Sequence, residues 1–263
     1  MNVNFFKYQG TGNDFILIDN REGVIQKKHY RYFSLWCDRH FGIGADGLIL
    51  LQRAEGYDFQ MKYFNSDGRE STMCGNGGRC IIQFASDLGI IQKKCSFMAI
   101  DGPHSGEVIS RGVTLRMSDV KGLLSHSDSS FSLDTGSPHY VRLVKGVKHF
   151  DVERKGRAIR HSRAYRESGI NVNFAEWQNN LLHVRTYERG VESETLSCGT
   201  GVVASALVWS FIQKWPRGKR LRLEIETTGG PLQVRFMRRG EDEWTEIDLT
   251  GPAKRVFSGQ LSI

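Results

Sequence analysis

Two cysteines in matched glycine-rich segments are the residues of this sequence best suited to chemistry. Cys74 opens the run Cys-Gly-Asn-Gly and Cys198 opens the run Cys-Gly-Thr-Gly, and an apolar stretch with helical character follows each run. A thiol at a helix N-terminus lies beside unpaired backbone N–H groups and the positive end of the helix dipole, which lower the pKa of a thiol and attract anions. The sequence therefore predicts two reactive thiols, each beside an anion site.

The segments that precede the two cysteines repeat as well. Residues 68–71 (Gly-Arg-Glu-Ser) come before Cys74, and residues 190–193 (Gly-Val-Glu-Ser) come before Cys198, so the same two motifs occur twice in the same order. A single cysteine is most simply a small buried hydrophobic residue. The repetition favours reactive thiols and indicates a chain built from two related halves.

Two chemically alike thiols suit a reaction in which a proton leaves one face of a carbon and another proton arrives on the opposite face. That reaction is racemisation or epimerisation, and it requires one cysteine as thiolate while the other is a thiol. Two helix N-termini directed at one cavity would also bind a substrate α-carboxylate and stabilise the negative charge that develops as Cα loses its proton. Such a design demands no pyridoxal cofactor, although a Schiff-base lysine remains an alternative.

The length and composition favour an α/β chain of two lobes. Glycine accounts for 29 of 263 residues, above the ordinary share of about 7%, and indicates many tight turns. The polar stretch 118–132 is the best candidate for the passage between lobes. We expect an N-terminal lobe over residues 1–119 with Cys74 and a C-terminal lobe over 120–251 with Cys198. The tail, about residues 252–263, is expected to return to the first lobe.

Several protein classes are disfavoured. The N-terminus lacks the features of a signal peptide, and the longest apolar run, residues 202–212, is shorter than the roughly 20 residues of a membrane span, so we expect a cytoplasmic protein. Five cysteines without Cys-x-x-Cys spacing indicate free thiols and no zinc site. The net charge of +7 keeps a nucleic-acid-binding protein as a distant alternative, because the basic clusters lack interleaved aromatic residues.

Other polar residues leave two interpretations open. Asn13 lies in a glycine-rich corner between two predicted strands, as a turn residue or as a ligand contact. His139 follows a Gly-Ser-Pro turn, where a lone histidine is more often structural than catalytic. Asn171 and Asn173 alternate along a predicted strand and face the same side. The apolar spacing also predicts a helix near residues 30–40, and a helix followed by a loop is predicted over 157–166.

The motifs around both cysteines resemble those of the diaminopimelate epimerase family, and the similarity spans nearly the whole chain. It is carried by Met73–Cys80, Glu188–Gly190, Ser197–Gly201, Gly10–Phe15, Gly42–Gly47, Phe64–Gly68, Pro138–His139 and Ile170–Phe174. The resemblance implies two pseudo-symmetric lobes, each a curled, mostly antiparallel, barrel-like sheet around a central helix, with the active site in the cleft between them. It implies pyridoxal-independent conversion of LL- to meso-diaminopimelate without cofactor or metal, and a homodimer.

The resemblance also assigns roles to individual residues. Cys74 and Cys198 would exchange protons with the substrate, and His139 and Glu188 would tune the thiols. Substrate contacts are implied for Asn13, Asn65, Gly75, Asn76, Asn171, Glu188, Arg189, Gly199 and Thr200.

Two positions depart from the family pattern. Ser137 stands where many members have Asn, and Gly47 stands where some have Gln. Either departure would give a water-mediated contact or an altered preference at the distal amino-acid centre of the substrate. The competing functions are proline- or hydroxyproline-type racemases, the related phenazine-pathway isomerase and a histidine-type racemase. Asn76 after Cys74-Gly75, and the presence of both cysteines, argue against the first two.

Overall fold

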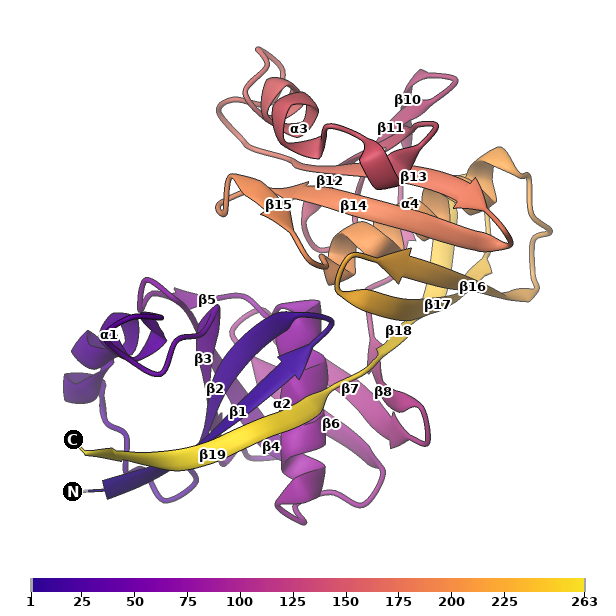
Figure 1. Cartoon of the computed structure of the whole chain (residues 1–263). Helices are drawn as coiled ribbons and strands as arrows, with labels where there is room; N and C mark the ends of the chain where they lie inside the picture. Colours follow the sequence, from indigo (N-terminus) through magenta and orange to yellow (C-terminus); the bar gives the residue numbers. More distant parts are fainter. Residues whose placement is uncertain (1, 263) are drawn as a thin grey trace. The chain divides into compact units, whose positions relative to one another are not determined.

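The computed structural model describes residues 2–262, and the chain divides into two compact units (Figure 1). The first unit comprises Met1–Leu115 and Gly251–Ile263, and the second comprises Arg116–Thr250. Both units are dominated by strands and contain few helices. The predicted two-lobed α/β fold is therefore confirmed. Among residues 2–262, no helix is long and apolar enough to cross a membrane.

The first unit is a curled mixed sheet around one long helix (Figure 1). Its strands are β1 (Asn2–Gly10), β2 (Asn13–Asp19), β3 (Gly47–Gln52), β4 (Phe59–Asn65), β5 (Glu70–Ser71), β6 (Lys94–Ala99), β7 (Gly102–Ile109), β8 (Gly112–Arg116) and β19 (Lys254–Ser262). Its helices are the 3₁₀ helix Lys27–Tyr32, α1 (Phe33–Cys37) and the central α2 (Gly75–Asp87).

The second unit has the same plan. Its strands are β9 (Val120–Lys121), β10 (Leu124–Ser127), β11 (Ser130–Asp134), β12 (Pro138–Leu143), β13 (Asn171–Gln178), β14 (Leu181–Glu188), β15 (Ser193–Thr195), β16 (Arg220–Thr227), β17 (Gly230–Arg238) and β18 (Glu243–Gly251). Its helices are the 3₁₀ helix Val147–His149, α3 (Val152–Arg160) and the central α4 (Gly199–Ile212).

The strand pairings show that the internal repeat of the sequence is a repeat of topology. In the first unit β1–β2, β3–β4, β6–β7 and β7–β8 pair antiparallel, while β2–β3 and β4–β6 pair parallel. In the second unit β11–β12, β13–β14, β16–β17 and β17–β18 pair antiparallel, while β12–β13 and β14–β16 pair parallel. The central helix follows the fourth of these strands in both units, so α2 and α4 are equivalent.

Strand β3 illustrates why the central strands are apolar without alternation. Leu48, Ile49, Leu50 and Leu51 are all fully buried. Leu48 and Leu50 pack into the cluster formed with Phe33 of α1, whereas Ile49 on the other face lies against α2 at Gly77. A strand covered on both faces reads as a continuous hydrophobic run, because neither set of alternating side chains meets water.

Helix α4 is apolar on all sides because the second sheet curls around it. Its buried residues extend from Gly199 to Ser210, and only Thr200 and Trp209 within that range are partly exposed. Helix α3 covers the outer face of the same sheet, where Val152 packs into a cluster with Phe174 and Tyr187. The central helix therefore has little freedom to move within its unit.

Two predicted helices differ from those observed. The helix expected over residues 30–40 is a 3₁₀ turn followed by the short α1, because the Asp38 carboxylate accepts hydrogen bonds from the backbone N–H groups of His40 and Phe41 and turns the chain. The helix expected within 157–166 begins earlier, at Val152, and ends at Arg160. Asp151 caps it by accepting from the backbone N–H of Arg154, a signal readable in the sequence.

The polar stretch 118–132 is not an unstructured passage. It contains β9, β10 and the start of β11, and β10 and β11 form a hairpin in the second unit. Its serines make the segment polar because β10 is exposed along its whole length. Exposure, and not a change of unit, accounts for its composition.

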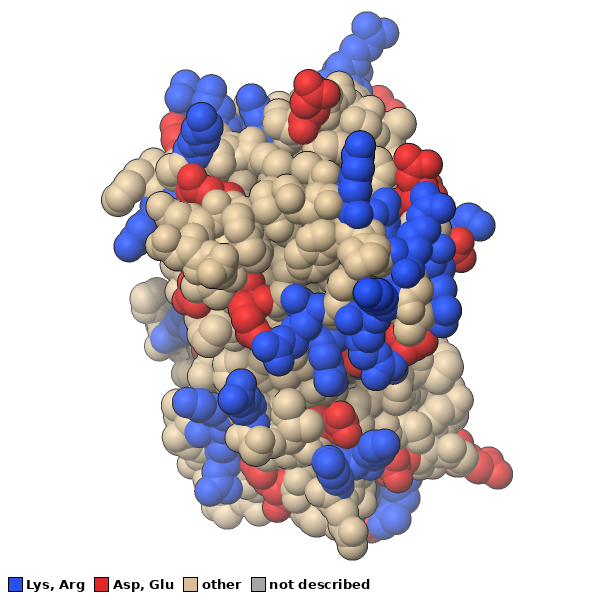
Figure 2. All heavy atoms as spheres, turned by 90° about the vertical axis from the view of Figure 1, so that its right-hand side faces the viewer, with Lys and Arg blue, Asp and Glu red and all other residues tan. Residues whose placement is uncertain are grey.

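The basic residues of the chain are interspersed with acidic ones on the face shown in Figure 2. Within the second unit, Arg220 and Arg239 both form ion pairs with Glu246, and Arg116 and Arg235 both form ion pairs with Asp248. Each of these two carboxylates therefore pairs with two guanidinium groups and balances part of their positive charge, and the whole chain carries a net charge of +7.

Gly156 in α3 has no space for a side chain. A Cβ there would lie 2.4 Å from the Cβ of Tyr187, an atom that cannot move without its strand. We expect Gly156→Ala to lower the free energy of unfolding by about 1–3 kcal/mol, although alanine has the higher helix propensity. Denaturant unfolding measures the change, with exposed Lys155→Ala in the same helix as the control. A Gly156→Ala variant as stable as the parent would contradict this packing.

Candidate active site

Cys74 is the residue immediately before α2, as the glycine-rich motif predicts. Its backbone is extended, and its carbonyl accepts from the N–H of Gly78 at 2.7 Å, which closes the first helical turn. A Cβ on Gly78 would meet Leu115 and the Met73 sulfur at 2.9 Å, so glycine lets the helix start pack closely under the cysteine. The half-buried thiol therefore stands on a rigid helix terminus.

Cys198 holds the equivalent place before α4. Its backbone is extended, and its carbonyl accepts from the N–H of Val202 at 2.9 Å. The Cys198 sulfur lies 3.5 Å from the Thr200 hydroxyl oxygen, and Gly201 lies so close to Asn173 that a Cβ would stand 2.1 Å from Oδ1. Both cysteines thus occupy helix N-cap positions, and neither side chain caps its helix.

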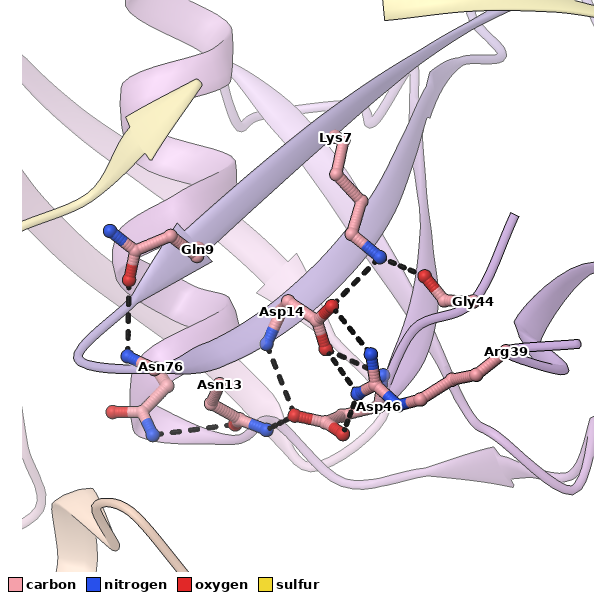
Figure 3. A network of polar contacts seen from close by, with 9 residues as sticks. Lys7, Gln9, Asn13, Asp14, Arg39, Gly44, Asp46 and Asn76 are labelled. Atoms are coloured by element: carbon pink, nitrogen blue, oxygen red, sulfur yellow. Dashed lines mark hydrogen bonds and ion pairs between the residues drawn. The ribbon is translucent and has the colours of Figure 1, made fainter. Parts of the chain in front are cut away.

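Asn13 is held in a network of charged and amide side chains that includes Asp46 and Asn76 (Figure 3). The β1–β2 turn consists of Thr11 and Gly12, both with positive φ, so Asn13 is the first residue of β2. Its Nδ2 donates to Asp46, and its Oδ1 lies 3.7 Å from the Cys74 sulfur and 3.3 Å from Nδ2 of Asn76. The structure brings together three predicted site residues here: Asn13, Cys74 and Asn76.

Charged neighbours fix that network in place. Arg39 donates to Asp14 at 2.8 Å and to Asp46 at 2.7 Å, and the buried Lys7 forms an ion pair with Asp14 at 2.8 Å. Burial alone would raise the pKa of Asp14, but the hydrogen bonds from Arg39 and Lys7 outweigh it and hold that pKa well below its ordinary value. The Asp14 carboxylate is therefore an anionic acceptor at neutral pH.

Asn171, Arg189 and Ser137 form a second polar group in the C-terminal unit. Asn171 donates from Nδ2 to the Ser137 hydroxyl at 2.9 Å and accepts at Oδ1 from the backbone N–H of Arg189 at 2.9 Å. The Arg189 guanidinium lies 3.4 Å from the same hydroxyl. Ser137, which departs from the family pattern, thus joins two predicted substrate contacts. Glu188, next to Arg189, accepts from the Thr195 hydroxyl at 2.9 Å.

Two further residues, Asn65 and Gly47, lie at the ends of strands. Asn65 ends β4 and is exposed. Gly47 opens β3, and a Cβ there would lie 2.5 Å from the Tyr63 ring and 2.6 Å from the carbonyl oxygen of Phe64. The Tyr63 ring therefore occupies the space that a longer side chain at position 47 would need.

His139 is fully buried in β12 and is held in one tautomer by Asn173. Asn173 donates from Nδ2 to the Tyr140 carbonyl, which can only accept, and the same Nδ2 lies 3.0 Å from Nδ1 of His139. The Thr186 hydroxyl donates to Oδ1 of Asn173 at 2.9 Å. Nδ1 of the ring is therefore an acceptor, so the ring proton resides on Nε2.

The surroundings of His139 keep its ring neutral. Burial, reinforced by the positive charge of Arg189, lowers the pKa of His139 to about 3. Its Nε2 has no hydrogen-bond partner among the described residues. The chemical consequence is a neutral N–H donor that does not take up a proton in the physiological pH range.

Several residues of these networks were absent from the predicted site, among them Arg79, Asp46, Asn173 and Thr186. Arg79 is fully buried one turn into α2 and donates to Asn76 at 2.8 Å. The sequence contains a signal for Asn173, because this residue alternates with Asn171 and so lies on the same side of β13. Arg79 and Thr186 had none, since neither their burial nor their partners follow from local sequence.

The fold is shared with solved structures at low sequence identity. A phenazine biosynthesis protein of the PhzF family from Bacillus anthracis superposes with a TM-score of 0.80 at 16% identity, covering 100% of both chains. A hydroxyproline epimerase from Agrobacterium vitis superposes with a TM-score of 0.70 at 12% identity, covering 99% of this chain and 92% of that chain. These likenesses define the fold class.

The sequence itself places the chain in one family. The family model described as diaminopimelate epimerase matches residues 5–118 and 131–256. The chain is 45% identical to a diaminopimelate epimerase of Flavobacterium psychrophilum, over 97% of this chain and 98% of the relative, and 42% identical to that of Chlorobaculum tepidum, over 97% and 99%. The chain belongs to the diaminopimelate epimerase family and is an epimerase-class isomerase, as its motifs predicted.

The neutral, buried His139 makes a specific contribution to acid sensitivity. The ring stays neutral in the folded protein but takes up a proton below pH ~6.5 once unfolded, so stability falls as the pH drops from that value towards 3. We expect a loss of about 2 kcal/mol from this group between pH 7 and pH 5.

Denaturant unfolding at the two pH values measures that loss. His139→Gln should show a correspondingly smaller loss than the parent, whereas the exposed His40→Gln control should behave like the parent. Equal losses in the parent and His139→Gln would show that the ring is not neutral in the folded state.

Proposed function

We propose that the protein converts LL-diaminopimelate to meso-diaminopimelate without pyridoxal phosphate, using Cys74 and Cys198 as the two proton-transfer groups. Membership of the family and the names of the two relatives described above support the substrate. The observation that carries the mechanism is the placing of a cysteine immediately before the central helix of each of two topologically equivalent units. The proposal requires the two helix N-termini to face one substrate carbon.

The proposed reaction moves two protons and leaves no net change in composition. The thiolate of one cysteine takes the proton from Cα, and the electron pair of the broken C–H bond delocalises into the adjacent carboxylate. The thiol of the other cysteine then protonates Cα from the opposite face and becomes the thiolate. The roles of the two cysteines exchange with the isomer bound, as a reversible reaction requires.

The helix N-termini would stabilise the charge that this reaction creates. Backbone N–H groups of Gly75 and Asn76, and of Gly199 and Thr200, would bind the α-carboxylate of the substrate. The positive ends of the α2 and α4 dipoles favour the additional negative charge in the transition state. Since these donors belong to helices packed inside their sheets, they need no reorganisation during the reaction.

The remaining predicted residues would recognise the rest of the substrate. Asn13 and Asn65 from the first unit, and Asn171, Glu188 and Arg189 from the second, would contact its carboxylate and amino groups. His139 would tune the thiol of Cys74 as a neutral N–H donor, and Glu188 would tune Cys198. The hydrogen bonds that join Asn171 and Arg189 through Ser137 support a shared role for these residues at the distal amino-acid centre.

The same proposal gives the protein its cellular setting. Conversion to the meso isomer serves lysine biosynthesis and supplies a peptidoglycan precursor. The protein would act in the cytoplasm as a homodimer.

Solvent isotope exchange tests the substrate and the two-thiol mechanism together. In deuterium oxide without pyridoxal phosphate, we expect the enzyme to incorporate deuterium at Cα of LL- or meso-diaminopimelate. Cys74→Ala and Cys198→Ala should each lower the epimerisation rate by about 10²–10⁴-fold or more, because each removes a proton-transfer group. Mass spectrometry follows the exchange, and chiral chromatography follows the isomers.

Cys95→Ala is the matched control, since Cys95 is a buried cysteine of β6 outside both helix starts. It should retain the parent rate. Exchange with proline or histidine but not with diaminopimelate would overturn the substrate. Full activity in either of the Cys74→Ala and Cys198→Ala variants would overturn the two-thiol mechanism.

A further inference from the structure

We propose that Arg79 and Asp46 are positioning residues that fix the direction of a hydrogen-bond chain through Asn76 and Asn13 to the Cys74 thiol. Neither residue belongs to the predicted site. The inference deepens the proposed function and rests on it only in treating Cys74 as a reactive thiol. It assigns to the first unit an electrostatic device that the second unit lacks.

Arg79 fixes the orientation of the amide at one end of this hydrogen-bond chain. Its Nη2 donates to Oδ1 of Asn76 at 2.8 Å, and because a guanidinium has no acceptor, the oxygen of the Asn76 amide must face it. Nδ2 of Asn76 is thereby directed to Oδ1 of Asn13, at 3.3 Å. Arg79 also donates to the Gly75 carbonyl at 3.2 Å and the Thr11 hydroxyl at 3.1 Å, so the guanidinium is held from several sides.

Asp46 sets the other end (Figure 3). Its Oδ2 accepts from Nδ2 of Asn13 and, at 3.1 Å, from the backbone N–H of Asp14. A carboxylate only accepts, so the Asn13 amide must turn its N–H₂ towards Asp46 and its oxygen towards Cys74. Arg39 holds Oδ1 of Asp46 at 2.7 Å. The two asparagines therefore have one orientation each, fixed from a cationic and an anionic end.

Arg79 also places a buried positive charge at its end of the hydrogen-bond chain, in addition to fixing the direction of the hydrogen bonds. The guanidinium is fully buried, and the oxygens of residues 2–262 that accept from it are neutral: those of Gly75, Thr11, Asn76 and Pro252. A buried cation without a carboxylate partner costs several kcal/mol unless an anion is supplied. Burial raises the pKa of the neighbouring Cys80 to about 12, so that thiol stays protonated. The Cys74 thiolate, or a bound carboxylate, is the anion that the positive charge of Arg79 can stabilise.

The repeat provides an internal comparison. Five residues after Cys74 the chain has Arg79, whereas five residues after Cys198 it has the fully buried Val203. The buried cation is thus a property of the first helix alone. Two sites that look alike at their Cys-Gly-x-Gly motifs have different charges one turn into their helices.

The two ends of the hydrogen-bond chain have opposite effects on the protonation of Cys74. The Asn13 oxygen, directed at the sulfur by Asp46, accepts from an S–H group and so favours the thiol. The Arg79 cation, together with the start of α2, favours the thiolate. In the proposed reaction Cys74 takes up a proton in one direction and releases it in the other. Both its thiol and its thiolate must therefore be populated at the working pH.

Site-resolved alkylation tests the inference without substrate. The full-length protein is treated with iodoacetamide across a pH series, and peptide mass spectrometry gives the rate at Cys74 and, as an internal reference, at Cys198. In Asp46→Asn the Asn13 amide is free to turn its N–H₂ towards the sulfur, so the pH midpoint for Cys74 should fall by about one unit. In Arg79→Met the midpoint should rise by about one unit, and in Arg79→Lys it should stay closer to that of the parent.

Asp101→Asn separates orientation from charge. Asp101 accepts from the backbone N–H of Met73, beside Cys74, but it does not bond to Asn13, so its neutralisation should shift the midpoint less than Asp46→Asn does. Equal shifts in these two variants, or no shift in Asp46→Asn, would overturn the orienting role of Asp46.

A fall or no change in Arg79→Met would overturn the role of the buried cation. Should Arg79→Met not fold, the two aspartate variants still decide the orienting role of Asp46. In that case, a Cys74 midpoint that falls in Arg79→Lys as far as it falls in Asp46→Asn would overturn the role of Arg79. Because no substrate is present, these outcomes are independent of the isotope-exchange result.

Discussion

The start of a helix leaves N–H groups without partners inside the helix, and this constraint organises both units. Serine, threonine, aspartate or asparagine ordinarily caps such a terminus with a side-chain oxygen. Here α2 and α4 each begin after a cysteine whose side chain does not cap the helix. A sulfur atom thus stands at the positive end of each of two dipoles. The curled sheets, the close-packed glycines and the amide networks all serve to hold those two helix starts.

The two helix starts are equivalent in backbone but not in electrostatics. In the first unit the amides of Asn13 and Asn76 lie between a carboxylate and a buried guanidinium, so the polar network carries full charges at both ends. In the second unit Asn173 lies between the neutral groups of Thr186, Tyr140 and His139, and it holds His139 as a neutral donor. The two helix starts of a duplicated fold therefore differ in the charges of the polar networks beside them.

Much of this arrangement could be predicted from the sequence, because local patterns determined it. The paired Cys-Gly-x-Gly motifs predicted both central helices, and the half-chain repeat predicted two similar units. The partners of side chains could not be predicted in the same way. Arg79 lies in a motif but gives no sign of its burial, and Asp46 reaches Asn13 from 33 residues away in the chain. The stretch 118–132 was misjudged because an exposed strand has the same composition as a linker.

We propose that Cys74 and Cys198 act on one substrate carbon, and disulfide formation tests this proposal most directly. Two cysteines can be joined only if their Cα atoms approach within about 7 Å. After mild oxidation of the folded protein, non-reducing peptide mapping should recover Cys74 linked to Cys198, with activity lost on oxidation and restored by reduction. A map in which both thiols remain free after activity is lost, or in which either is joined to Cys37, Cys80 or Cys95, would contradict the account.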